Sequence, residues 1–103
     1  MRPDDISLIL EASRAMSRSR ILIADDHALI RSGLKVLLEK EKDFEVVAEA
    51  SDGYEALELA RELKPDLAML DVGMPRLIGI DAAQQLAEKM PSIRTILVSI
   101  HSD

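Results

Sequence analysis

The stretch "RILIADDHALIRSGL" at residues 20–34 joins four apolar residues directly to two adjacent carboxylates, a histidine and a helix-like segment. A short, continuous apolar run such as "ILIA" at residues 21–24 is typical of a strand that is buried on both faces of a parallel sheet. Asp25 and Asp26 follow that run at once, although neighbouring like charges repel each other. We therefore expect a cation to offset their charge.

The same alternation of apolar runs and amphipathic segments continues along the chain. Strands are predicted at residues 21–24, 44–50, 66–70 and 93–100, and helices at 28–42, 54–64 and 80–90. The order βαβαβαβ with short connections predicts an open α/β fold, a doubly wound parallel sheet with helices on both faces. The first helix should pack on the sheet through one apolar stripe, formed by Ile30, Leu34, Leu37 and Leu38.

The composition narrows the possible classes of function. The 103 residues suffice for one domain, and 48% hydrophobic residues with only two aromatic side chains indicate an aliphatic core. A net charge of −6 argues against binding of nucleic acid by this chain, and the lack of cysteine excludes disulfides and thiolate metal sites. No apolar run reaches the ~20 residues of a membrane span, and the N-terminus lacks the pattern of a signal peptide. We expect a cytoplasmic protein that does not bind membranes.

Four polar side chains are predicted to meet at one edge of the sheet. Asp25 and Asp26 follow the first strand, Asp71 follows the third, and Ser99 lies near the end of the fourth. In such sheets ligands bind beyond the carboxyl ends of the strands. Mg²⁺ favours one or two carboxylates together with an anionic phosphate group, and a carboxylate is also a nucleophile toward phosphorus. Asp71 is the natural nucleophile, because it stands alone before a loop that contains glycine.

Three motifs, "ILIADDHALIRSGL", "LDVGMPRLIGID" and "TILVSIHSD", occur in this order on the expected elements. Together they resemble the receiver domain of two-component response regulators, and more narrowly the LuxR/NarL-type subfamily. The resemblance covers residues 20–103 and implies a flavodoxin-like, CheY-like fold. Residues 1–19 would then be an N-terminal extension, helical or disordered.

The resemblance also implies a role for each residue of the site. Asp71 would be the phospho-acceptor, and Ser99 would be the switch hydroxyl that turns toward the phosphoryl group. Mg²⁺ would be held by Asp71, by Asp26 directly, by Asp25 mostly through water, and by the backbone carbonyl of Gly73. A sensor histidine kinase would be the phosphodonor, and a DNA-binding output domain would follow residue 103. The chain would be a phosphoryl acceptor rather than an enzyme.

Two departures from the subfamily pattern qualify these expectations. Ile78 stands where the subfamily usually has a polar residue. A complete receiver also continues through a fifth strand that carries an essential lysine, so this chain resembles a receiver truncated after its fourth strand. We accordingly expect weak or short-lived phosphorylation. The exposed fourth strand and the uncovered sheet face predict a homo-oligomer.

Several alternatives remain open from the sequence. The acid pair could form a simple turn in which one carboxylate caps the helix. A phosphatase of the haloacid dehalogenase type would need a second acid at position 73, where this chain has Gly73. The chain could also be a receiver-like interaction module that is never phosphorylated. His27 is interpreted as a helix-start residue and His101 as a surface residue rather than as metal ligands, because Mg²⁺ prefers oxygen.

Overall fold

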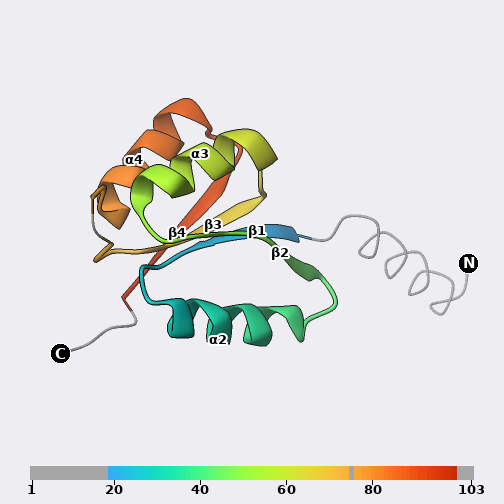
Figure 1. Ribbon diagram of the computed structural model, residues 1–103. Helices are drawn as coiled ribbons and strands as arrows, with labels where there is room; N and C mark the ends of the chain where they lie inside the picture. The colour runs from blue at the N-terminus through green and yellow to red at the C-terminus, as the bar shows by residue number, and fades with distance from the viewer. Residues whose placement is uncertain (1–18, 75, 100–103) are drawn as a thin grey trace, which may run out of the picture.

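The computed structural model describes residues 19–74 and 76–99. Its elements, in chain order, are β1 (Ser19–Ala24), α2 (Ala28–Glu39), β2 (Phe44–Ala50), α3 (Gly53–Leu63), β3 (Leu67–Asp71), α4 (Gly79–Lys89) and β4 (Arg94–Val98). The strands form one parallel sheet in the order β2-β1-β3-β4. Helix α2 lies on one face of the sheet, and α3 and α4 lie together on the other (Figure 1). The predicted doubly wound sheet is thus confirmed.

Strand β1 begins two residues earlier than predicted, at Ser19 rather than at position 21. The N–H of Ser19 donates to the carbonyl of Asp43 at 2.7 Å, and the N–H of Arg20 donates to the Asp66 carboxylate at 2.8 Å. Backbone pairing therefore extends the strand beyond its apolar part. The remainder of the expected extension, residues 1–18, lies outside the described residues.

The main core lies between the sheet and the helix pair α3 and α4. Small side chains at Ala56 and Ala60 are fully buried and allow α3 to approach the strands closely. Leu22, Leu70 and Leu86 fill the space between these layers and are also fully buried. Each of these leucines contributes roughly 1.5–3 kcal/mol by leaving water. This core holds in place the carboxyl ends of the strands, where the acidic side chains of the predicted site are located.

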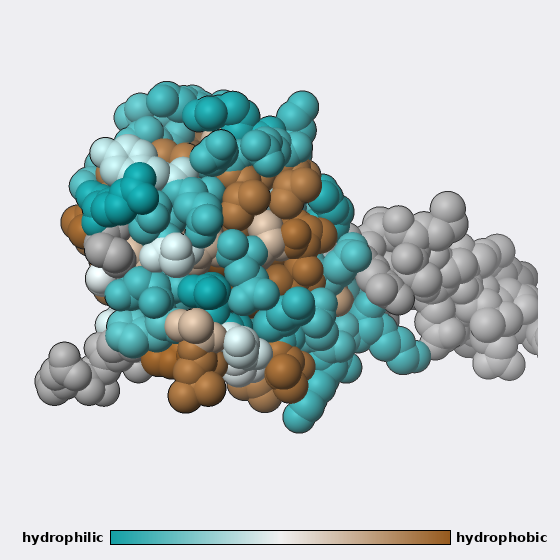
Figure 2. Space-filling model, viewed as in Figure 1, coloured by the Kyte–Doolittle hydropathy of each residue, from teal (hydrophilic) through white to brown (hydrophobic). Residues whose placement is uncertain are grey.

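Helix α2 covers its face of the sheet less completely than the sequence pattern predicts. It contains no buried residue, and Leu37 of the predicted stripe is 61% exposed. Leu34 and Leu38 are partly buried whereas Leu37 is exposed, so the part of the helix that meets the sheet is narrower than the predicted stripe. Figure 2 shows hydrophobic surface in the region of this helix. No helix in the described part of the chain has the length and apolar character that a bilayer crossing requires.

Candidate functional site

The carboxyl ends of β1 and β3 lie side by side, because Ala24 pairs with Leu70 in the parallel register. This register places Asp25, just after β1, beside Asp71, the last residue of β3. Both side chains are 1% exposed, whereas Asp26 is exposed. Ligand-type atoms of Asp25, Asp26, His27 and Asp71 all lie within 4.8 Å of one another. The structure therefore brings together the three acids that the sequence placed at this edge.

The turn between β1 and α2 is fixed by hydrogen bonds to Asp25. Its Oδ1 accepts from the backbone N–H of His27 at 2.7 Å, and its carbonyl accepts from Nη1 of Arg31 at 2.6 Å. Nε of Arg31 also donates to Glu49 of β2 at 3.2 Å. The N-cap of α2 is His27, without a capping hydrogen bond from its side chain. The alternative in which one acid of the pair is the cap of this helix is therefore wrong.

The His27 side chain turns toward the acid pair. Its Nδ1 lies 3.0 Å from Oδ1 of Asp26 and 3.3 Å from Oδ1 of Asp25. The expected position at the start of the helix is confirmed. Its closeness to both carboxylates was missed, and the only signal for it in the sequence was adjacency to the pair.

The loop that follows Asp71 ends at Gly79, which lies against the end of β3. Oδ1 of Asp71 accepts from the N–H of Gly73 at 3.3 Å. At the far end of the loop, a Cβ built on Gly79 would overlap the carbonyl oxygen of Asp71 and lie 2.8 Å from its carbonyl carbon. Glycine at position 79 is therefore required by close backbone contact. The residue that ends β3 and the residue that starts α4 are packed directly together.

Comparison with known proteins identifies this arrangement. Residues 21–103 match the model of the response regulator receiver domain family. The chain belongs to that family. The transcriptional regulatory protein DegU of Brevibacillus brevis is 39% identical to the receiver over 87 residues, which cover 84% of this chain and 37% of DegU. PdtaR of Mycobacterium tuberculosis, also a transcriptional regulatory protein, is 53% identical over 79 residues, which cover 77% of this chain and 38% of PdtaR.

Solved structures give the same result. A two-component response regulator of the LuxR family from Aurantimonas superimposes with a TM-score of 0.78 at 35% identity, over 84% of this chain and 61% of that chain. The flavodoxin-like, CheY-like fold and the resemblance to LuxR/NarL-type receivers are thus confirmed. The receiver spans less than two fifths of the two curated relatives described above.

Ser99 follows β4, the strand that pairs with β3. Asp71 is opposite Val98 in the register of β3 and β4, and the N–H of Val72 donates to the carbonyl of Val98 at 3.0 Å. Ser99 is the next residue, exposed at the same edge of the sheet. Its role as a switch hydroxyl stays a prediction.

One further cluster of the receiver was not anticipated from the sequence. Nη1 of Arg76 lies 3.0 Å from Oδ2 of Asp52, and its guanidinium carbon lies 5.2 Å from the centroid of the Tyr54 ring. Asp52 is the N-cap of α3 and accepts from the N–H of Glu55 at 2.9 Å. Arg76 and Asp52 are 24 positions apart, so no local pattern links them.

Proposed function

We propose that the receiver accepts a phosphoryl group from a sensor histidine kinase on Asp71, with Mg²⁺ held by Asp25, Asp26, Asp71 and the backbone carbonyl of Gly73. The observation that carries this proposal is the convergence of three carboxylates, two of them almost completely buried, at the carboxyl edge of a parallel sheet. Membership of the receiver family supports it independently.

The donor set suits a hard divalent cation. Carboxylate and carbonyl oxygens are the ligands that Mg²⁺ prefers, and neighbouring ligand atoms in an octahedral site lie about 3 Å apart. Gathering carboxylates within 4.8 Å costs repulsion that a divalent charge offsets. When bound, Mg²⁺ would neutralise negative charge on the phosphoryl oxygens.

The chain's own residues would carry out the transfer. A carboxylate oxygen of Asp71 forms a bond to phosphorus, while the bond from phosphorus to the donor atom breaks and that atom keeps the electron pair. The backbone N–H of Gly73 donates to Oδ1 of Asp71 and so helps to hold the carboxylate in position. Ser99 would donate its hydroxyl hydrogen to a phosphoryl oxygen and so sense the modification.

The whole protein would be a cytoplasmic transcription regulator. The relatives DegU and PdtaR are both transcriptional regulatory proteins, and this chain matches only part of each. We place DNA binding in another domain of the protein, because the receiver carries a net charge of −6. The receiver would be the phosphoryl-accepting input of that regulator rather than an enzyme.

Treatment with acetyl phosphate tests the proposal directly. After a short incubation with Mg²⁺ and rapid acid quenching, intact mass spectrometry is expected to show a fraction of the chain heavier by one phosphoryl group. Peptide mapping should place that group on Asp71, and EDTA should prevent its addition. An unmodified chain at every time point would favour the alternative, an interaction module that is not phosphorylated.

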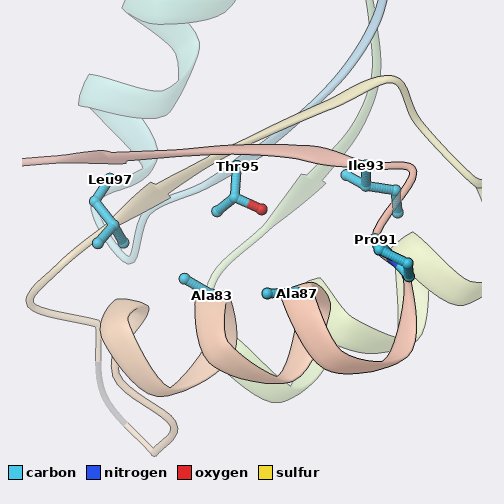
Figure 3. Close-up of a pocket in the computed structure, with 6 residues that line it drawn as sticks. All are labelled: Ala83, Ala87, Pro91, Ile93, Thr95 and Leu97. Carbon is cyan, nitrogen blue, oxygen red and sulfur yellow. The ribbon is translucent and has the colours of Figure 1, made fainter.

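We also propose that the receiver associates with a second copy of itself along β4. Within the described residues β4 pairs only with β3, and Ile96 is 45% exposed. An open hollow of about 450 Å³ lies between β4 and α4 (Figure 3), lined by Ala83, Ala87, Pro91, Ile93, Thr95 and Leu97. An edge strand offers a row of backbone donors and acceptors, which an identical edge can satisfy reciprocally.

Sedimentation of the full chain tests this association. The unmodified chain is expected to dimerise with rising concentration, and Ile96→Lys should weaken the dimer about tenfold or more, because it introduces charge at the apolar edge. Val36→Lys is the matched control, since Val36 is exposed on α2 and away from β4. A folded monomer at all concentrations would rule out the dimer.

A further inference from the structure

Arg76 has a backbone conformation that residues with side chains rarely adopt. Its φ is 67°, and among the described non-glycine residues only Lys64 shares a positive φ. Lys64 is the left-handed residue that ends α3, a common role for this conformation. Arg76 ends no helix. The left-handed conformation therefore costs free energy that contacts elsewhere must offset.

Two side chains at the start of α3 make those contacts. Oδ2 of Asp52 forms an ion pair with Nη1 of Arg76 at 3.0 Å. Oδ1 of Asp52 caps α3 by accepting a hydrogen bond from the N–H of Glu55. The Asp52 side chain is 11% exposed and the Arg76 side chain is 65% exposed, so solvent screens this ion pair mainly from the arginine side. The Tyr54 ring lies beneath the guanidinium at a distance suited to a cation–π contact.

The backbone next to Arg76 is also pressed against α3. A Cβ built on Gly53 would overlap the carbonyl oxygen of Leu77 and lie 2.7 Å from the Leu77 Cβ. The acceptor loop, defined here as residues 72–74 and 76–78, is therefore held on α3 by a side chain at position 76 and by the backbone at position 77. Its ends are fixed by Asp71 and by Gly79.

We propose that Arg76 is a positioning residue for the phosphorylation site. Its contacts with Asp52 and Tyr54 hold the acceptor loop on α3 and thereby keep Gly73 beside Asp71, where the Gly73 carbonyl is the proposed Mg²⁺ ligand. This inference rests on the proposed function. It adds a residue that touches neither the metal nor the phosphoryl group and acts through the conformation of the loop.

The proposal predicts a specific kinetic pattern. Without the Arg76 contacts a smaller fraction of the molecules has the loop in the conformation that binds Mg²⁺. The apparent Mg²⁺ affinity falls in proportion to that fraction. Arg76→Gln is expected to raise the Mg²⁺ concentration for half-maximal phosphorylation by about three- to tenfold, because Gln lacks the charge that Asp52 holds. The rate at saturating Mg²⁺ should stay within about twofold, because bound metal selects the competent conformation. Arg76→Lys, which keeps the charge, should restore part of the affinity.

Two measurements on the full chain separate positioning from general stability. The first is the Mg²⁺ dependence of phosphorylation by acetyl phosphate, together with Mg²⁺ binding by calorimetry. The second is hydrogen exchange, which should be faster in Arg76→Gln only within the acceptor loop. Arg61→Gln is the matched control, because Arg61 is exposed in the last turn of α3, and it should change neither measurement.

The outcomes distinguish this inference from the proposed function. Weaker Mg²⁺ binding with faster exchange confined to the acceptor loop supports the role of Arg76. An unchanged Mg²⁺ dependence in Arg76→Gln, in a parent chain that binds Mg²⁺, overturns it. A parent chain that binds no Mg²⁺ refutes the proposed function instead. In that case exchange in the loop decides whether Arg76 holds it: faster exchange supports the contact, and unchanged exchange rejects it.

Discussion

Exchanging Asp71 for asparagine is expected to abolish Mg²⁺-dependent phosphorylation of the receiver. The amide has nearly the same shape and keeps an oxygen that can accept the Gly73 N–H at 3.3 Å, so the loop should stay in place. It lacks the anionic oxygen that is proposed to attack phosphorus and to bind the cation. Intact mass spectrometry after acetyl phosphate treatment and acid quenching should show only the unmodified mass.

The matched control is Asp81→Asn, the same chemical change at an exposed residue in the first turn of α4. It should be phosphorylated as the parent chain is. Stability gives a second readout, because two unit charges 4.8 Å apart repel by about 1 kcal/mol in water and about 3.5 kcal/mol at an effective dielectric constant of about 20. Asp71→Asn should therefore unfold at higher urea concentration without Mg²⁺ and gain less from its addition. Phosphorylation of Asp71→Asn to the parent level would contradict the assignment.

Exchanging Gly79 for alanine is expected to lower the free energy of unfolding by about 1–3 kcal/mol or more. The added methyl group would overlap the Asp71 carbonyl oxygen and lie 2.9 Å from the Cα of Val72. These are backbone atoms at the end of β3, which cannot rotate away as a flexible side chain can. Urea unfolding without Mg²⁺, followed by circular dichroism, measures the change.

Gly33→Ala is the matched control for this change. Gly33 lies inside α2, and apart from the neighbouring backbone of that helix a Cβ there would meet no atom within 4 Å. Alanine in a helix interior should raise the free energy of unfolding by about 0.5–1 kcal/mol. The same substitution is thus expected to have opposite signs at the two positions. Equal unfolding midpoints for Gly79→Ala and the parent chain would contradict this prediction and show that the backbone near Gly79 shifts to accommodate the methyl group.

The sheet could be predicted because strands that are buried on both faces must be continuously apolar. The run "ILIA" at residues 21–24 is short enough to favour a strand over a helix, and the order of elements then limits the topology. The acids of the site could be predicted for the same reason. Parallel strands bring their carboxyl ends to one edge, so Asp25 and Asp71 converge although they are far apart in the sequence.

The remaining contacts depend on side-chain directions that periodicity does not encode. Leu37 belongs to the apolar stripe by spacing, yet its side chain is largely exposed in the folded chain. The approach of Arg76 to Asp52 depends on a left-handed backbone residue in a loop, for which arginine gives no signal. The extension of β1 to Ser19 follows from pairing with a distant segment.

The central place of β1 in the sheet also bears on how the chain folds. Its neighbour β3 follows only after β2 and α3, and the hydrogen bond between Arg20 and Asp66 joins residues 46 positions apart. Closing so long a segment costs chain entropy before any contact is gained, which slows folding of parallel sheets relative to helical bundles. Because Asp25 and Asp71 meet only when β1 and β3 have paired, no local fragment of the chain can assemble the acid cluster. The acid cluster is therefore expected to form only once β1 and β3 have paired, and cation binding would report that this central pair of strands is in place.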